Sequence, residues 1–162
     1  MEVEPVTQVI PSENPALDSF LHHCHTKKYD ARSTIIHAGD ESETLYYIID
    51  GSVSVVIEDE NCNEIVLAYL NPGDFFGEMG LFEEHIKRSA WVIARTICEV
   101  AEIHYNQFMV LARETPEILF QLSSQLASRL RNTSRKVSNL AFMDVTGRVA
   151  RTLLDLAREP DA

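Results

Sequence analysis

The sequence is poor in residues that would build a disulfide framework or a zinc site. Its three cysteines, Cys24, Cys62 and Cys98, are widely spaced and never form a CxxC pair, so we predict neither kind of site. No apolar run approaches the roughly 18 residues that span a bilayer. The first residues also lack the basic start and apolar middle of a secretion signal. We therefore expect a cytoplasmic protein with no membrane partner.

Basic residues are also scarce. The chain carries 14 Lys and Arg against 25 Asp and Glu, a net charge of -11. The polyanionic backbone of nucleic acid would be repelled by most of such a surface, so the chain as it stands is not expected to bind DNA by itself. Its 162 residues, 45% of them hydrophobic, suffice for one well-filled core or for one domain with an appended element.

The first half of the chain predicts a β domain behind a short helix. Residues 1–13 are polar and predict a mobile arm, and residues 14–114 form the expected domain. Asn14 can cap a helix from Pro15 to His25, which we interpret as a lid and not as a core helix. Between residues 33 and 104, six runs of β-branched and aromatic residues alternate with turn signals. This pattern is typical of a small barrel or jelly roll.

After Tyr105 the pattern becomes helical, with a short helix at 105–115 and a long one beyond Pro116. The long helix carries a narrow apolar seam at Leu119, Leu122, Leu126, Leu130, Thr133, Val137 and Leu140. Such a seam is typical of a coiled-coil partner. Packing on the chain's own β domain is the alternative, but about 24 residues make a rod of about 36 Å, longer than one small barrel covers. We expect a parallel homodimer through residues 116–140.

Residues 115–143 are therefore interpreted as a dimerisation helix and hinge, and residues 144–162 as the start of a separate structural unit. Asp144 can cap another amphipathic helix. Its apolar face consists of Val149, Leu153, Leu154 and Leu156, and no later segment of this sequence covers that face. We interpret 144–162 as the first helix of a second, truncated domain.

The stretch GEMGLFEEHIKRSAW, residues 77–91, has the composition of an anion site. Arg88 can hold a phosphodiester by two parallel charge-assisted bonds, Gly77 allows close approach of the backbone, and Ser89 can add a hydroxyl group. Glu78 needs a donor of its own, which a ribose hydroxyl would provide. The alternative is a surface ion pair between Glu78 and Arg88, which is common and contributes little.

Thr133 favours the interpretation of residues 77–91 as a sugar-phosphate site over that of a surface ion pair. A threonine within an apolar seam is unfavourable unless it finds a hydrogen-bond partner, and Ser134 lies about 100° further round the helix. We interpret Thr133 as reaching a base bound in its own barrel and Ser134 as reaching the base bound in the partner. A Ser/Thr pair bonded to its own helix backbone remains the alternative.

Three stretches resemble the cyclic AMP receptor protein family, the catabolite activator and virulence factor regulator group of bacteria. They are ETLYYIIDGSVSVVIEDE, GDFFGEMGLFEEHIKRSAWVIA and RLRNTSRKVSNLAFMDVTGRVARTLLDLAREPDA. The resemblance covers the chain after about Asn14. It implies a mainly β fold with helices, a cyclic-nucleotide-binding β roll (double-stranded β-helix) followed by a long dimerisation α-helix. Beyond residue 162 it implies a winged helix-turn-helix, through which alone DNA would bind.

The resemblance also implies a function and a site. The function is that of a transcription activator whose allosteric ligand is cyclic AMP. By motif match, Arg88 and Ser89 would hold the cyclic phosphate, and Gly77 and Glu78 the phosphate and the ribose hydroxyl. The other implied ligand contacts are Thr133 and Ser134 on adenine, Leu67 and Ala68 beside the base, and Met79 and Gly80 in the turn.

The segments Glu58 to Glu64 and His25 to Lys28 resemble surfaces that touch RNA polymerase. The loop before Arg88 departs from the family pattern because it puts an apolar Ile86 at a normally polar position. That change could alter access to the pocket, and some relatives respond to a cyclic dinucleotide instead. A sensor of another cyclic nucleotide or dinucleotide is therefore one alternative, and a structural dimerisation module with a vestigial pocket is another.

An enzyme is the remaining alternative, because the β roll shares its shape with metal-dependent cupins. The neighbouring His22, His23 and His25 would point in different directions on a helix, and no second cluster completes a metal shell. Neither a metal pair nor a water-activating base for a phosphodiesterase is visible. We therefore expect neither a metal site nor an enzyme.

Overall fold

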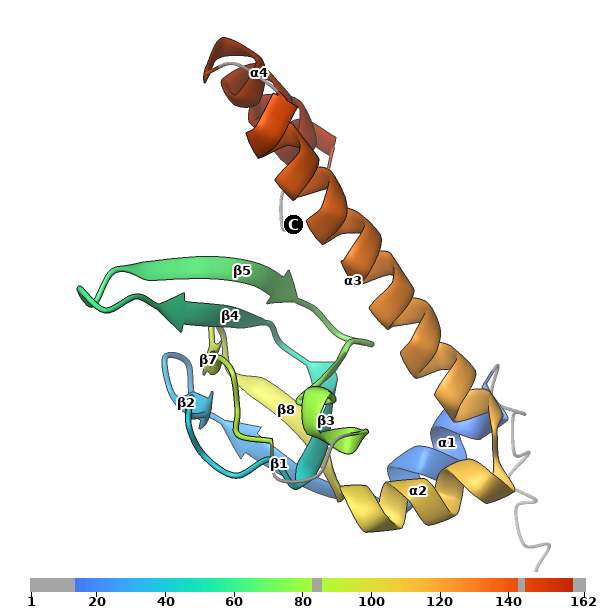
Figure 1. Cartoon of the computed structure of the whole chain (residues 1–162). Helices are drawn as coiled ribbons and strands as arrows, with labels where there is room; N and C mark the ends of the chain where they lie inside the picture. The colour runs from blue at the N-terminus through green and yellow to red at the C-terminus, as the bar shows by residue number, and fades with distance from the viewer. Residues whose placement is uncertain (1–13, 83–85, 143–144, 159–162) are drawn as a thin grey trace, which may run out of the picture.

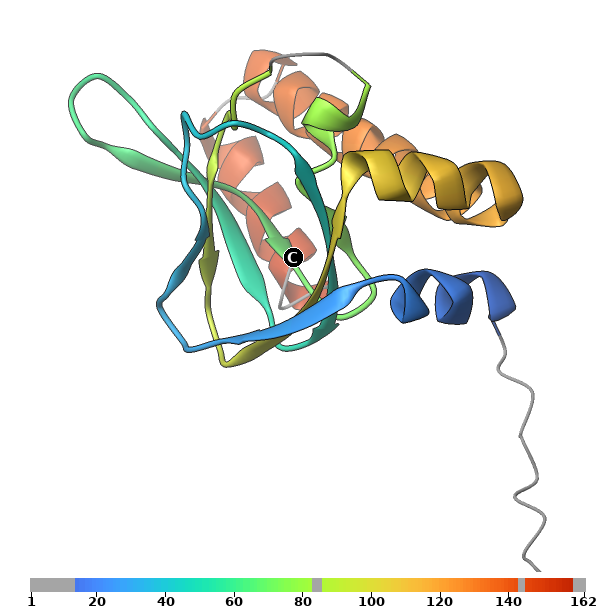
Figure 2. The same cartoon turned by 90° about the horizontal axis from the view of Figure 1, so that it is seen from below.

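The computed structural model describes residues 14–82, 86–142 and 145–158. The expected mobile arm, the expected cap Asp144 and the Glu159–Pro160 end of the last helix lie outside the described residues. Two four-stranded antiparallel sheets face each other, in the orders β1-β8-β3-β6 and β2-β7-β4-β5. Figures 1 and 2 show the resulting roll, with α1 and α2 at one end and the long α3 running past it. The expected mainly β fold with helices is confirmed.

The six predicted β runs all form strands, and two further strands occur. The strands are β1 (His25–Tyr29), β2 (Thr34–Ile36), β3 (Thr44–Asp50), β4 (Val53–Glu58), β5 (Glu64–Leu70), β6 (Phe75–Phe76), β7 (Trp91–Ala94) and β8 (Cys98–His104). The helices are α1 (Pro15–His22), the 3-10 turn η1 (Met79–Leu81), α2 (Tyr105–Glu114), α3 (Glu117–Phe142) and α4 (Val145–Arg158).

Helix α1 is a core helix, so its interpretation as a lid is wrong. Phe20 is fully buried and meets the rings of Tyr47, Phe75 and Phe108 edge to face. Burial of a phenylalanine contributes about 1.5–3 kcal/mol, so this one residue pins α1 to the roll. The helix also ends earlier than predicted, because the chain enters strand β1 at His25.

The apolar seam of α3 divides into two parts. Leu122 is buried in the core of the same chain, and Leu119 and Leu126 pack against that core. Further along, Leu130 and Val137 are exposed by 69% and 59%. The alternative that the seam packs on its own domain thus holds for the first turns only, and the second half of α3 extends beyond the roll (Figure 1).

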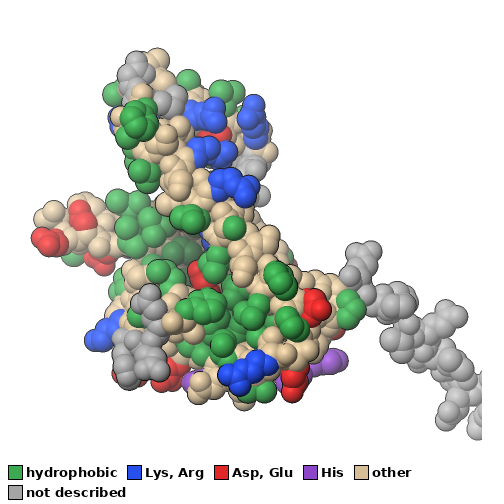
Figure 3. All heavy atoms as spheres, turned by 45° about the vertical axis from the view of Figure 1, so that its right-hand side comes forward, with side chains coloured by type: hydrophobic (Ala, Val, Ile, Leu, Met, Phe, Trp, Pro, Cys, Tyr) green, Lys and Arg blue, Asp and Glu red, His purple; other side chains and the backbone are tan. Residues whose placement is uncertain are grey.

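Two more apolar surfaces are exposed outside α3. One is the face of α4 that includes Val149 and Leu153, as the sequence predicted. The other lies on β5, where Ile65 and Leu67 are exposed by 56% and 46%. Figure 3 shows hydrophobic side chains gathered on the projecting β4–β5 hairpin, beside the long helix, with acidic side chains at the hairpin tip.

Candidate functional site

Strand β6 delivers the chain to a sharp turn at Gly77. The turn is left-handed, with φ of +74° at Gly77, and a Cβ atom there would lie 2.8 Å from Arg88 Nη1 and 2.9 Å from Tyr46 Cδ2. Glycine is therefore required at position 77 for two reasons. The left-handed backbone disfavours other residues, and there is no room for a Cβ atom. We expected the missing side chain to make room for a phosphate, but the space is filled by Arg88 and Tyr46.

Arg88 is half-buried and is held by groups of the protein. Its Nη1 donates to the Gly77 carbonyl at 2.9 Å and to the Tyr105 hydroxyl at 3.2 Å, and its Nη2 donates to the Thr44 carbonyl at 2.7 Å. These bonds use three of the five N–H donors of a guanidinium group. The other two are left for an anion. The side chain is thus fixed in direction before any ligand arrives, with donor capacity to spare.

Two tyrosines surround this guanidinium group. Arg88 Cζ lies 5.6 Å from the centroid of the Tyr46 ring and 6.0 Å from that of Tyr105. Burial raises the pKa of Tyr46, and the charge of Arg88 opposes that rise, so Tyr46 stays a neutral phenol. Neither tyrosine was identified from the sequence, because each lies in an ordinary apolar run with no motif of its own.

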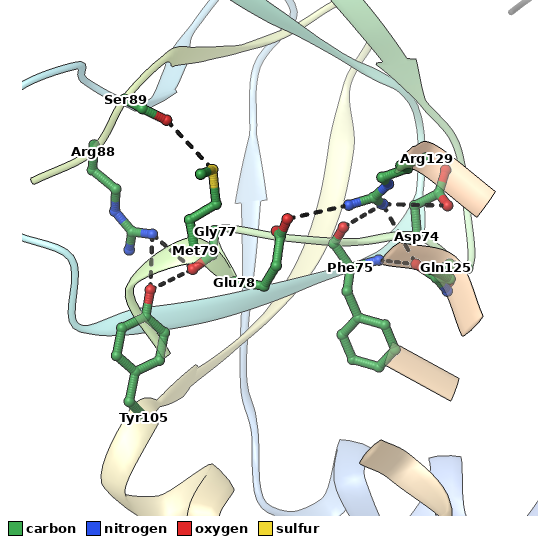
Figure 4. A network of polar contacts seen from close by, with 11 residues as sticks. Asp74, Phe75, Gly77, Glu78, Met79, Arg88, Ser89, Tyr105, Gln125 and Arg129 are labelled. Carbon is green, nitrogen blue, oxygen red and sulfur yellow. Dashed lines mark hydrogen bonds and ion pairs between the residues drawn. The ribbon is translucent and has the colours of Figure 1, made fainter. Parts of the chain in front are cut away.

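Glu78 is also half-buried, with 14% of its side chain exposed, but its ion-pair partner is not Arg88. Its Oε1 lies 3.8 Å from Arg129 Nη1 on helix α3. Among the described residues no carboxylate lies within ion-pair distance of Arg88, so the alternative of a Glu78–Arg88 pair is wrong. Figure 4 shows Glu78 on the turn beside Gly77 and directed toward Arg129, whereas Arg88 comes from a separate segment and reaches the Gly77 carbonyl from the other side.

Helix α3 is hydrogen-bonded to residues 73–75, the segment that precedes this turn. The Gln125 amide accepts from the Phe75 N–H at 2.9 Å and donates to the Gly73 carbonyl at 2.7 Å. Arg129 Nη2 donates to the Phe75 carbonyl at 2.5 Å and lies 3.6 Å from Asp74 Oδ1. Neither Gln125 nor Arg129 was identified from the sequence. Their polar positions between seam leucines are the only signal that could have identified them.

The remaining turn residues lie on either side of Arg88. Ser89 is exposed and its hydroxyl lies 3.6 Å from the sulfur atom of Met79, which is itself 63% exposed. Gly80 is buried, and a Cβ atom there would lie 2.3 Å from Ser42 Oγ. Met79 and Ser89 can therefore meet a ligand, whereas Gly80 contributes close packing. Ile86 is half-buried in the same strip of chain.

The structure places the expected base contacts apart from one another. Val55 pairs with Ala68 and Val56 with Val66, so Leu67 is the extra residue of a β-bulge, a device that redirects side chains. Ala68 packs against the inner core, whereas Leu67 is exposed.

The two hydroxyl residues expected on adenine lie further away along the chain. Thr133 and Ser134 are exposed on α3, and within the described residues no hydrogen bond joins either of them to the roll. One chain alone thus brings Arg88 to the turn that carries Gly77 and Glu78, whereas Thr133 and Ser134 lie exposed on the helix.

The described residues contain no group of three or more His, Cys, Asp or Glu side chains placed to hold a metal ion. None of their helices is both long and apolar enough to cross a membrane.

A β roll with an arginine held at a glycine turn matches a known class of domain. Residues 26–115 match the family model of the cyclic nucleotide-binding domain. The chain belongs to this family, as the sequence resemblance implied.

Relatives of the whole chain are bacterial regulators. The chain is 59% identical over 155 residues to the cAMP-activated global transcriptional regulator CRP of Pasteurella multocida, covering 96% of this chain and 74% of the relative. It is 60% identical to the protein of the same description from Salmonella typhimurium, covering 94% and 72%. It is 59% identical to the cAMP-activated regulator Vfr of Pseudomonas aeruginosa, covering 90% and 70%.

Solved structures support the same fold. The c-di-GMP-responsive global regulator CLP of Xanthomonas campestris superposes with a TM-score of 0.82 at 44% identity, covering 91% of this chain and 73% of its own. The catabolite activator protein of Thermus thermophilus superposes with a TM-score of 0.71 at 31% identity, covering 92% and 70%. This chain therefore spans roughly seven tenths of each of these longer proteins.

Proposed function

We propose that this chain is the cyclic AMP-sensing and dimerising part of a transcriptional activator in the cytoplasm. The observation that carries the proposal is Arg88, half-buried and held by three protein groups, with two N–H donors left for the cyclic phosphate. Glu78 would accept from the ribose hydroxyl beside it. The names of the relatives, which are cAMP-activated regulators, support cyclic AMP as the ligand.

The adenine side of the site requires a second copy of the chain. In the proposed homodimer, residues 116–140 of two chains pack through the exposed half of the seam, which includes Leu130, Val137 and Leu140. Thr133 would then contact the base in its own roll and Ser134 the base in the partner. This arrangement supplies a partner both for the exposed leucines and for the two exposed hydroxyl groups.

Ligand binding would be transmitted through α3. Glu78 already contacts Arg129, and Gln125 holds the backbone at residues 73–75, so a ligand at the turn acts on the helix through existing bonds. The ligand would favour one arrangement of the two long helices and hence of the domains attached beyond residue 144. DNA would bind through those domains. RNA polymerase would be met at Glu58 to Glu64 and His25 to Lys28.

Calorimetry with the purified chain tests the ligand. Cyclic AMP should bind saturably, and Arg88→Leu should weaken binding by at least about tenfold, because charge-assisted hydrogen bonds contribute about 1.5–3 kcal/mol. The matched control is Arg95→Leu. That arginine is exposed and stacks on Tyr69 at 4.3 Å, so its loss should leave binding unchanged.

The same titration distinguishes the alternatives. Cyclic di-GMP must be included because CLP, at 44% identity, is described as responsive to it. Tighter binding of that dinucleotide would replace cyclic AMP in the proposal. No heat from either nucleotide would favour a structural dimerisation module, and formation of AMP during incubation would reveal an enzyme.

A further inference from the structure

The Tyr105 hydroxyl group, at the start of α2, contacts three groups around the turn at Gly77. They are the Gly77 carbonyl, Arg88 Nη1 at 3.2 Å and Ser42 Oγ at 2.6 Å. A phenol has one proton to donate and can also accept. A carbonyl can only accept and a guanidinium group can only donate, so Tyr105 donates to Gly77 and accepts from Arg88. Ser42 must therefore be the donor to Tyr105.

The hydrogen bonds thus run in one direction, from Ser42 to Tyr105 and from Tyr105 to the Gly77 carbonyl. The hydrogen bond that Ser42 donates polarises the phenol group of Tyr105. The hydrogen bond that Tyr105 in turn donates to the Gly77 carbonyl is therefore strengthened. The Gly77 carbonyl is held by Tyr105 and by Arg88 together. Because the peptide group is planar, a fixed carbonyl also fixes the direction of the Glu78 N–H group.

Ser42 is itself anchored beside Arg88 by the backbone. Its N–H donates to the Ile86 carbonyl at 3.2 Å, and the Arg88 N–H donates to the Asp40 carbonyl at 2.8 Å. Its side chain is enclosed as well, because a Cβ atom at Gly80 would come within 2.6 Å of the Ser42 Cβ atom. Ser42 therefore has little freedom to turn away from Tyr105.

We propose that Ser42 is a positioning residue for the anion site, acting through the Tyr105 hydroxyl group to orient Arg88 and the Gly77 peptide. This inference rests on the proposed function and concerns the same site. Ser42 lies outside the motif stretch at residues 77–91, and its sequence neighbours predict no role for it. The loss of its hydroxyl group would leave Arg88 in place but free to adopt more than one orientation.

The test compares Ser42→Ala with the unchanged 162-residue chain by calorimetry. One hydrogen bond contributes about 0.5–1.5 kcal/mol, so cyclic AMP should bind about two- to thirteenfold more weakly. Ser33→Ala is the matched control, since the hydroxyl group of that serine makes one hydrogen bond, to the Asp30 carbonyl at 2.6 Å in a turn between β1 and β2. Its binding should not change.

A second measurement separates orientation from simple destabilisation. The two phosphorothioate diastereomers of cyclic AMP carry sulfur at one or the other exocyclic position of the phosphate. A fixed Arg88 distinguishes these positions, so the ratio of the two dissociation constants should move toward unity in Ser42→Ala. Mere loss of stability would weaken both diastereomers equally and leave the ratio as it was.

Tyr105→Phe completes the test. If Ser42 acts through Tyr105, adding Ser42→Ala to Tyr105→Phe should weaken binding by less than about twofold further. Additive losses, an unchanged ratio or full affinity of Ser42→Ala would each overturn the proposal. If the unchanged chain bound no cyclic nucleotide, both the proposed function and the role of Ser42 would be refuted. The outcomes above refute only the role of Ser42 and leave the proposed function intact. Ser42→Cys, a near isostere with a weaker donor, replaces the alanine variant if that variant does not fold.

Discussion

Replacing Gly77 with alanine should damage both the fold and the anion site. The left-handed backbone at φ +74° would cost an alanine about 1–2 kcal/mol. The new Cβ atom would lie 2.8 Å from Arg88 Nη1 and 3.1 Å from the Thr44 carbonyl, and overpacking of this kind costs about 1–3 kcal/mol. We expect the free energy of unfolding to fall by about 2–5 kcal/mol, the sum of the two ranges.

Gly39 provides the control, because it has the same kind of backbone without the crowding. Its φ is +91° and a Cβ atom there would meet nothing within 4 Å. Gly39→Ala should therefore cost only the conformational 1–2 kcal/mol, about 2–8 °C in melting temperature. Thermal melting and urea unfolding measure both variants.

The two alanine variants should also differ in ligand binding. In Gly77→Ala the guanidinium group of Arg88 has to withdraw from the new methyl group, so cyclic AMP affinity should fall by at least about tenfold, the loss expected of a charge-assisted hydrogen bond. In Gly39→Ala the affinity should be unchanged. Equal losses of stability in the two variants, or unchanged affinity in Gly77→Ala, would refute the argument that this glycine makes room for Arg88.

Three other predictions concern the α3 contact and the hairpin tip. Gln125→Ala should lower the free energy of unfolding by about 1–3 kcal/mol, because it leaves two backbone groups unsatisfied; unchanged urea unfolding would contradict this. Cys62 should react slowly with iodoacetamide although it is exposed, because a hydrogen bond and the charge of Glu58 raise the pKa of its thiol. Glu58→Gln should speed that reaction, and an equal rate would count against the contact. Hydrogen bonds from Asn63 and Asn61 lower the pKa of Asp59, so its stabilisation of the tip is present above the ordinary aspartate pKa and disappears as the pH falls through the lowered value. NMR titration of the tip amides should show a midpoint below the ordinary one, and an ordinary midpoint would contradict it.

The β roll could be predicted because its strands alternate clearly and its turns carry strong signals. Runs such as residues 44–50 and 98–104 became strands with little change at their ends. Strand β1 was missed because four of its five residues are exposed and show no apolar alternation. Its pairing with β8 depends on the rest of the sheet, not on its own residues.

The candidate site could be predicted only in part. The chemistry of Arg88 and Glu78 was visible in the sequence, since arginine and carboxylate groups need identifiable partners. The partners of these two side chains could not be predicted, because Tyr105 lies 17 positions from Arg88 and Arg129 lies 51 positions from Glu78 in the sequence. How much of the α3 seam packs on the chain's own domain was also not predicted, for the same physical reason. Periodicity tells which residues share a helix face, but not how far along the helix its own domain reaches.

The central claim is that Arg88 holds the cyclic phosphate while Glu78 holds the ribose. A crystal structure of the chain grown with cyclic AMP tests this claim most directly. We predict that the phosphate lies within hydrogen-bond distance of the Arg88 guanidinium group and the ribose hydroxyl within hydrogen-bond distance of the Glu78 carboxylate. A nucleotide bound elsewhere on the roll, with Arg88 still bonded only to Gly77, Thr44 and Tyr105, would contradict the claim.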